Sequence, residues 1–206
     1  KGITETFLAA GANVLICGRS APEHLPSVDG NTAVFVECDV RDYEQIEACV
    51  DAAVSQFGRL DVLVNNAGGA PYADAATASP RFSESIIRLN LIAPLNFAQV
   101  ANRVMQTQDS GGSIINIASV STIRPSPGTA AYGAAKAGLN NLTEGLARTY
   151  APRVRCNCIM PGAFLTDISE AWPPEVKEHI NAMVPLGRAA QPEEIVGIAL
   201  YLASDA

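Results

Sequence analysis

The sequence has no long hydrophobic run and no excess of positive charge. None of its apolar stretches reaches the roughly 18 residues that a membrane-spanning helix needs, so the sequence predicts no transmembrane segment. It has 14 basic and 21 acidic residues, which gives a formal net charge of −7. This balance disfavours nonspecific binding to nucleic acids and to anionic membranes.

Metal-type cysteine spacing is also lacking. The five cysteines are Cys17, Cys38, Cys49, Cys156 and Cys158. They form no Cys-x-x-Cys pair and have no neighbouring histidine at ligand spacing, and most of them lie within apolar runs. The sequence therefore predicts buried free thiols, a reducing cytoplasmic environment and no metal centre.

Strand-like apolar runs alternate with amphipathic helical patterns along all 206 residues. The predicted strands cover 13–18, 32–40, 60–69, 111–119 and 154–162, and the predicted helices cover 1–12, 41–58, 81–106, 131–150 and 191–206. Residues 21–32 and 70–80 are predicted loops. This alternation is typical of an α/β fold with a parallel sheet covered by helices on both faces. No repeat or linker divides the chain, so we expect a single domain over 1–206.

The two ends are unusual for such a sheet. A doubly wound fold normally begins with a strand and a glycine-rich turn, whereas this sequence begins with a helical pattern and also ends on one. We therefore expect a trimmed part of a longer chain, from which the first and last strands are missing.

Tyr132 and Lys136 are four residues apart in an alanine-rich helical pattern, so they share one helix face. Ser119 ends the preceding strand, at the sheet edge where α/β folds bind ligands. A phenol, an ammonium and a hydroxyl could there transfer a proton to a carbonyl or from an alcohol. Taken alone, the pattern is more often a half-exposed tyrosine, a solvated lysine and a serine cap.

Other motifs in the sequence favour the catalytic interpretation of this pattern. The motifs are LVNNAG at 63–68, Asn90 in RLNLIAP, Ser119 in NIAS, YGAAK with Tyr132 and Lys136, and PGAFLT at 161–166. Their order, and the 13-residue separation of Ser119 from Tyr132, resemble the short-chain dehydrogenases/reductases over essentially the whole chain. The resemblance implies a doubly wound Rossmann-type fold and an NAD(P)-dependent oxidoreductase acting on a CH–OH group.

The resemblance also implies roles for the catalytic residues. Tyr132 would be the general acid and base, and Lys136 would lower its pKa and bind the nicotinamide ribose. Ser119 would hold the substrate oxygen, with Ser121 as an alternative at a separation two residues shorter. Asn90 would hold a water of a proton relay; its alternative interpretation is a local distortion of the helix.

Cofactor preference is predicted from the end of the strand at 13–18. NAD-preferring relatives commonly place an acid there, whereas this sequence has Gly18 followed by Arg19. Arginine can bind a 2′-phosphate through two N–H bonds, and Lys1 matches a second basic position. We therefore expect NADP(H), with NAD(H) as the alternative. The other implied cofactor contacts are Gly2 and Ile3 at the pyrophosphate turn, Ser20, Asp39 and Val40 at the adenosine, Asn65, Ala67 and Gly68 at the NNAG turn, and Pro161, Gly162 and Thr166 at the nicotinamide, besides Tyr132 and Lys136.

The substrate is left open by the residues. A helical flap at Phe164–Leu186, with Trp172, His179 and Met183, and the loop between Gly69 and Pro80 would wall the pocket. A 3-oxoacyl thioester, a sugar or polyol, and a steroid-like ketone all remain candidates. The family resemblance implies a homotetramer or homodimer formed through the two long helices, with no nucleic-acid or membrane partner. The alternative functions are a non-catalytic dinucleotide sensor, an NAD-dependent sugar or polyol dehydrogenase, and an isomerase or dehydratase that recycles its nicotinamide.

Overall fold

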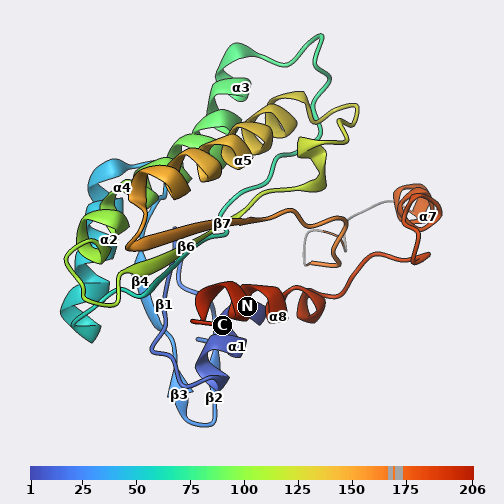
Figure 1. Cartoon of the computed structure of the whole chain (residues 1–206). Helices are drawn as coiled ribbons and strands as arrows, with labels where there is room; N and C mark the ends of the chain where they lie inside the picture. The colour runs from blue at the N-terminus through green and yellow to red at the C-terminus, as the bar shows by residue number, and fades with distance from the viewer. Residues whose placement is uncertain (167–168, 170–173) are drawn as a thin grey trace.

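A computed structural model describes residues 1–166, 169 and 174–206 and has the predicted α/β architecture. Its parallel strands are β1 (Leu15–Gly18), β4 (Val34–Glu37), β5 (Val62–Asn65), β6 (Gly112–Ile117) and β7 (Val154–Ile159). Helices α2 (Tyr43–Phe57), α4 (Ala93–Met105) and α5 (Ala130–Tyr150) lie on one side of the sheet, and α1 (Gly2–Ala9) and α8 (Val196–Ala203) lie on the other (Figure 1). The prediction of helices on both faces is therefore confirmed.

The strands form two hydrogen-bonded groups. β1 pairs with β4, while β5, β6 and β7 pair in that order. Within the described residues, no ladder joins β1 to β5. The central strand β6 is packed from both sides, and Ile114 and Ile115, which point to opposite faces, are both 0% exposed. A strand preceding residue 1 stays a prediction.

Local sequence signals explain where α2 begins and ends. The Asp42 side chain accepts hydrogen bonds from the backbone N–H groups of Glu44 and Gln45, which caps the helix N-terminus. Gly58 ends the helix in the left-handed conformation, with φ of 78°, which glycine adopts without steric cost. Ile46 and Val50 are buried against the β1–β4 side of the sheet, so the amphipathic pattern predicted the correct face.

The predicted loop over 21–32 is wrong in part. It contains a short antiparallel hairpin of β2 (Ser27–Val28) and β3 (Asn31–Thr32). Its turn is Asp29-Gly30, with φ of 49° and 81°. An Asp-Gly pair is a strong hairpin signal, but the flanking segments are too short and polar to show a strand pattern.

The predicted continuous helix over 81–106 also needs a correction. It consists of α3 (Pro80–Ile87), a π-helical turn at Arg88–Ile92, and α4. A π-turn contains one residue more than the corresponding α-helical turn, and such turns are frequent at functional sites. The apolar periodicity hardly changes across one such turn, so the sequence pattern did not reveal it.

The flap over Phe164–Leu186 is anchored at its base. Phe164 forms a parallel bridge with Ala190, and the Leu165 N–H donates to the Ala190 carbonyl at 2.8 Å. Helix α7 (Pro174–Met183) stands away from the sheet (Figure 1). Met183 is exposed, whereas Trp172 and the side chain of His179 lie outside the described residues.

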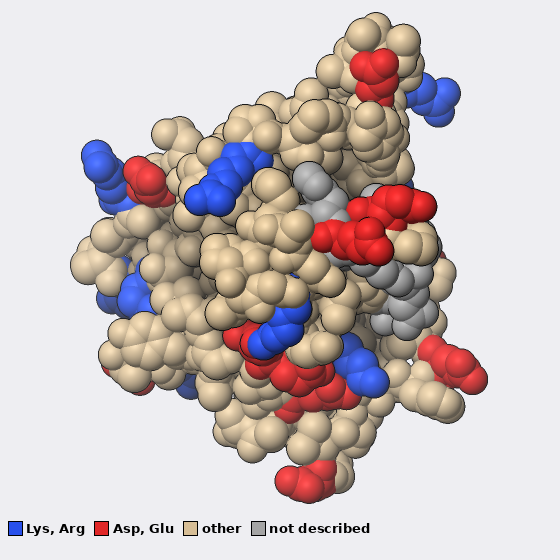
Figure 2. Space-filling model, turned by 90° about the vertical axis from the view of Figure 1, so that its right-hand side faces the viewer, with Lys and Arg blue, Asp and Glu red and all other residues tan. Residues whose placement is uncertain are grey.

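The face on the α7 side carries acidic and basic side chains that are scattered among larger uncharged areas (Figure 2). In the part of the chain that the structure describes, no helix is both long and apolar enough to cross a membrane.

Candidate active site

The segment from β6 to α5 positions Ser119, Tyr132 and Lys136. After β6, the Ala118 N–H donates to the Ile159 carbonyl and the Val120 N–H donates to the Pro161 carbonyl, at 2.8 and 2.9 Å. These bonds hold the strand end against the segment that follows β7. The Ser119 hydroxyl accepts from the Ser121 N–H at 3.2 Å and caps a 3₁₀ turn at Val120–Thr122. Tyr132 and Lys136 then lie in the first two turns of α5.

Lys136 is a buried cation directed at Tyr132. Its side chain is 3% exposed, and its Nζ donates to the Ile117 carbonyl at 2.7 Å. The same Nζ lies 5.8 Å from the centroid of the Tyr132 ring. Burial lowers the pKa of Lys136 from 10.5 to about 8, partly offset by nearby Cys158. The ammonium is therefore still mostly charged at neutral pH, in a site with little water to screen it.

Asn90 lies at the centre of the π-turn and is 0% exposed. Its Nδ2 donates to the carbonyls of Gly69 and Ile86 at 2.9 and 3.0 Å. Its Oδ1 accepts from the Gly69 N–H at 2.9 Å. Asn90 thus lies in a local helix distortion, which turns its amide towards the loop that follows β5. A role in a proton relay stays a prediction.

Close contacts around residue 68 explain why the NNAG turn ends in glycine. A Cβ at Gly68 would lie 2.7 Å from the Asn90 Oδ1 and 3.0 Å from the Lys136 Nζ. Both separations are too short for a side chain to be accommodated without movement. The structure therefore brings Gly68, Asn90, Lys136 and Tyr132 together at the carboxyl ends of β5 and β6, and a ligand could approach the backbone closely there.

Two buried polar residues were missed by the sequence analysis. Asn116 accepts a hydrogen bond from the Asn65 Nδ2 and donates to the Thr143 Oγ1, both at 2.9 Å. Thr143 in turn donates to the Leu139 carbonyl at 2.7 Å. The Asn65 side-chain N–H groups are therefore used inside the protein, in bonds to Asn116 and to the Pro94 carbonyl. The available signal was an asparagine in each of two neighbouring apolar strands, and Asn65 and Asn116 are paired in register.

Ser121 has a different environment from Ser119. Its Oγ is buried and has no hydrogen-bond partner among the described residues. Buried hydroxyls usually have a partner, so this oxygen is free to interact with a bound molecule or a water.

At the other end of the sheet edge, the predicted adenosine contacts gather around Asp39. Arg19 and Ser20 are exposed just after β1, while Val40 packs against the hydrophobic core. The Asp39 carboxylate accepts from the Arg41 Nη2 at 2.6 Å and from its Nε at 2.9 Å. These bonds, together with the charges of Arg41 and Arg19, lower the pKa of Asp39 to about 2. Arg41 was not predicted, because an arginine four residues after the end of β4 carries no distinctive signal.

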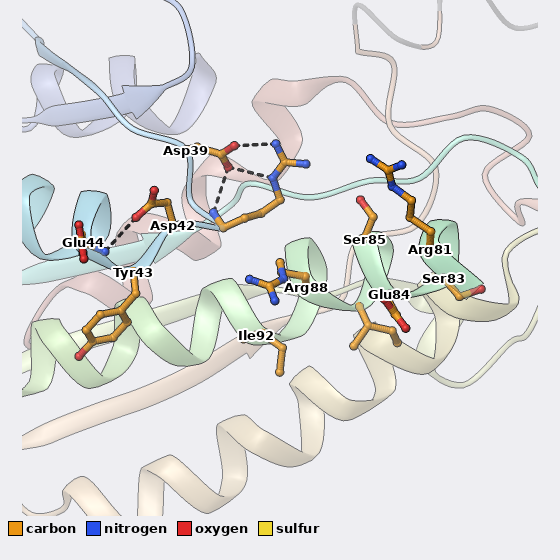
Figure 3. Close-up of a pocket in the computed structure, with 12 residues that line it drawn as sticks. Asp39, Asp42, Tyr43, Glu44, Arg81, Ser83, Glu84, Ser85, Arg88 and Ile92 are labelled. Atoms are coloured by element: carbon orange, nitrogen blue, oxygen red, sulfur yellow. Dashed lines mark hydrogen bonds and ion pairs between the residues drawn. The ribbon is translucent and has the colours of Figure 1, made fainter. Parts of the chain in front are cut away.

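An open cleft lies next to this group of charges (Figure 3). Residues of the β4–α2 connection form one wall, and residues of α3 and the π-turn form the other, including Arg81, Arg88 and Ile92. Figure 3 shows Asp39 held by the neighbouring arginine at the rim. A second, narrower cavity lies beside Tyr132, and residues of the loop after β5, such as Pro71 and Ala73, line it together with Phe82.

The remaining predicted cofactor residues lie at element ends. Gly2 begins α1, whose first N–H groups have no partner within the helix, and such an end attracts anionic groups. Lys1 is exposed, and its Nζ lies 4.0 Å from the Glu5 Oε1. The Ile3 side chain packs into the core.

The turn after β5 and the segment after β7 present mostly backbone. Ala67, Gly68 and Gly162 are exposed, and Pro161 binds the Val120 N–H through its carbonyl. The Ser169 hydroxyl holds Thr166, accepting from its N–H at 2.9 Å and donating to its carbonyl at 2.6 Å. A free helix N-terminus, an exposed glycine turn and a basic strand end fit the phosphates and sugars of a dinucleotide.

Comparisons with known proteins agree with this geometry. Residues 1–206 match the family described as enoyl-(acyl carrier protein) reductase. The chain is 35% identical to the 3-oxoacyl-[acyl-carrier-protein] reductase FabG of Chlamydia muridarum, over 99% of this chain and 85% of that protein. It is 36% identical to the L-rhamnose 1-dehydrogenase (NAD(P)(+)) of Azotobacter vinelandii, over 85% of this chain and 70% of that protein.

A solved structure has the same fold. A double mutant of a Serratia marcescens short-chain dehydrogenase/reductase superposes with a TM-score of 0.91, at 28% identity, and the match covers 99% of this chain and 85% of that one. The matches span nearly the whole chain and include relatives named for reduction or dehydrogenation. The chain therefore belongs to the short-chain dehydrogenase/reductase family and is an NAD(P)-dependent oxidoreductase.

Proposed function

We propose that the protein transfers a hydride between NADP(H) and a carbonyl or alcohol substrate, with Tyr132 as general acid and base. The observation that carries this proposal is the buried Lys136 ammonium, 5.8 Å from the Tyr132 ring centroid. A buried positive charge beside the ring assists proton transfer to and from the Tyr132 hydroxyl, because it stabilises the negative charge that develops on the oxygen.

The chain's own residues divide the remaining work. In the reducing direction the Tyr132 O–H donates its proton to the carbonyl oxygen, and in the oxidising direction the phenolate accepts it. The Ser119 hydroxyl holds the same oxygen beside Tyr132. Asn90 positions the turn at Gly68, so that the nicotinamide cofactor, which supplies or accepts the hydride, can lie close to the sheet edge. Lys136 remains charged throughout and also binds the cofactor ribose.

A tyrosine-to-phenylalanine exchange tests the mechanism. Tyr132→Phe removes the transferable proton and should lower kcat by at least about 100-fold. Binding of NADPH, followed by its fluorescence, should change little. Tyr201→Phe is the matched control, because Tyr201 is 54% exposed on α8, and it should keep full turnover. Unchanged turnover in Tyr132→Phe would refute this role of Tyr132, whereas a wild type that binds NADPH but turns over no carbonyl or alcohol would favour the non-catalytic sensor.

Preference for NADP(H) is supported by the charges around Asp39. Arg19 and Arg41 both act on this one carboxylate. Arg41 hydrogen-bonds it, whereas Arg19 is exposed and its guanidinium can bind a 2′-phosphate. Arg19→Asp should shift the ratio of kcat/KM for NADPH over NADH at least tenfold towards NADH. Arg148→Asp, at an exposed position in the last turn of α5, should leave the ratio unchanged. A wild-type preference for NADH would refute this part of the proposal.

For the substrate we propose a ketone or the corresponding secondary alcohol, with 3-oxoacyl thioesters as the first candidates. Relatives are named for 3-oxoacyl-[acyl-carrier-protein] reduction, L-rhamnose oxidation and 3alpha-hydroxysteroid oxidation. A panel with one compound of each class, assayed by NADPH consumption or formation, separates them. Tightly retained nicotinamide after dialysis would favour an isomerase or dehydratase.

We further infer a cytoplasmic homotetramer or homodimer formed through the helices at 81–106 and 131–150. Ile92 is 39% exposed in the π-turn, next to the alanine- and glycine-rich α5, so close helix packing between subunits is sterically possible. Sedimentation as a monomer at micromolar concentration would contradict this assembly.

A further inference from the structure

Three cysteines that are far apart in the sequence meet beneath the adenosine end of the site. Cys17 lies in β1, Cys38 directly follows β4, and Cys49 lies in α2. Their Sγ atoms all lie within 4.8 Å of one another. The other two cysteines lie in β7, which belongs to the β5–β6–β7 group of strands and not to the β1–β4 pair.

The convergence follows from the register of the sheet. Cys17 is paired with Val36 in the parallel β1–β4 ladder, and Cys38 is two residues beyond Val36. Residues two apart in a strand point to the same face, so both thiols face the helix layer. Helix α2 covers this face and contributes Cys49 from its buried side. Sequence spacing did not reveal the cluster, because each ligand comes from a different element.

We propose that Cys17, Cys38 and Cys49 form a binding site for one thiophilic metal ion with a filled d shell, such as Zn²⁺. In tetrahedral zinc sites the Zn–S distance is about 2.3 Å, which places the sulfur atoms about 3.8 Å apart. Thiols already within 4.8 Å need to approach by about 1 Å or less. A disulfide needs about 2.05 Å and would use only two of the three sulfurs, so the geometry fits a shared metal ion better.

Binding is a proton exchange without a redox change. Zn²⁺ binds three thiolates, three protons are released to solvent, and a water completes the coordination. Residue Cys17 is exposed at the side of β1 that pairs with no other described strand, whereas Cys38 and Cys49 are buried.

The three thiols influence one another's pKa. Hydrogen bonding from Cys49, and more weakly from Cys38, lowers the pKa of Cys17 in spite of its partial burial. The hydrogen bond to Cys17, together with burial, raises the pKa of Cys49. Burial raises the pKa of Cys38 to about 11.

A bound ion would tie together β1, the end of β4 and α2. Cys17 and Cys38 come shortly before Arg19 and Asp39, which are proposed to hold the adenosine. Binding should therefore raise the Tm of the chain by linkage. This consequence concerns the folded chain alone, so it can be measured without cofactor or substrate and does not depend on the proposed reaction.

The test is a metal titration of the reduced, metal-free chain under anaerobic conditions. Cd²⁺ is followed through its thiolate charge-transfer absorption, and Zn²⁺ through competition with a coloured chelator. We expect one ion per chain and a higher Tm. Cys17→Ser, Cys38→Ser and Cys49→Ser should each weaken binding by at least about 100-fold, because loss of an outer-shell partner alone costs roughly 10- to 100-fold. Cys156→Ala, in β7, should bind normally.

A second measurement uses the unaltered chain and so does not depend on the folding of the variants. Zn²⁺ should protect Cys17 from iodoacetamide, as mapped by peptide mass spectrometry. Equal alkylation of Cys17 with and without Zn²⁺ would refute the proposal, as would unchanged affinity in Cys17→Ser. Formation of a disulfide within the cluster, with no metal binding by the reduced chain, would also overturn it and identify a redox pair instead.

Discussion

The charge on Lys136 reduces the stability of the folded chain, and this cost can be measured. The side chain is 3% exposed, and burial lowers its pKa from 10.5 to about 8. At about 1.4 kcal/mol per pKa unit, keeping the ammonium charged in the folded state costs about 3 kcal/mol near neutral pH. Lys136→Met removes this cost. It also leaves the Ile117 carbonyl without the donor that now lies 2.7 Å away, a loss of about 1 to 3 kcal/mol.

The sign of the pH dependence follows from the two pKa values. Between about pH 8 and 10.5 the unfolded chain binds the Lys136 proton and the folded chain does not. Unfolding therefore takes up a proton, and the stability of the wild type rises with pH in that window. Near pH 7, Lys136→Met should equal the wild type or exceed it by up to about 2 kcal/mol. By about pH 10 this difference should fall by about 2 to 3 kcal/mol.

Urea denaturation of the cofactor-free wild type and Lys136→Met near pH 7 and pH 10 measures the difference in their free energies of unfolding. The titration of all groups that the two proteins share cancels in this difference. Lys1→Met, at an exposed position, is the control and should show no such trend. Turnover of Lys136→Met should fall by at least about 100-fold. A difference in stability that is the same at both pH values would refute the reasoning, as would a variant that is much less stable near pH 7.

Two further substitutions test the surrounding contacts. Gly68→Ala places a Cβ against Asn90 and Lys136. It should lower the free energy of unfolding by about 1 to 3 kcal/mol and reduce kcat/KM. The control is Gly145→Ala, where nothing lies within 4 Å of the added Cβ, and it should raise the free energy of unfolding by about 0.5 to 1 kcal/mol. Asn116→Ala removes the bonds that Asn116 makes to Asn65 and Thr143. It should lower the free energy of unfolding, measured by urea denaturation, by about 2 to 4 kcal/mol. A loss below about 0.5 kcal/mol would show that the network adds little.

Much of the fold could be predicted because its elements are separated by clear local signals. The strands β6 and β7 are apolar runs bounded by glycine, proline or charge, and α5 was predicted to begin within one residue of its observed start. The π-turn at Arg88–Ile92 could not be predicted in the same way. One extra residue hardly disturbs the apolar periodicity, and the bonds that hold Asn90 come from a loop some twenty residues away.

The residues of the site also differ in how well the sequence predicted their contacts. Tyr132 and Lys136 were placed together by helix geometry alone, since residues four apart share a face. The Asn65–Asn116 bond depends on strand register, which apolar runs do not specify. The Cys17–Cys38–Cys49 cluster depends on register and also on the position of α2 over the sheet. Contacts within one element were therefore predictable, whereas contacts between elements required the structure.

The buried polar residues show where the chain gives up stability. Of the seven buried polar or charged residues among those described, five belong to the site or to the network behind it: Asn65, Asn90, Asn116, Lys136 and Thr143. A purely structural core would favour apolar side chains at such positions, because each buried polar group must be desolvated and then satisfied. The four neutral residues make hydrogen bonds to one another or to the backbone. Lys136 also makes such a bond, but it carries a charge that this bond alone does not require. A non-catalytic sensor would need Lys136 only as a hydrogen-bond donor to the cofactor ribose, whereas proton transfer at Tyr132 also needs its charge. A gain in stability together with a loss of turnover in Lys136→Met would therefore separate the two functions.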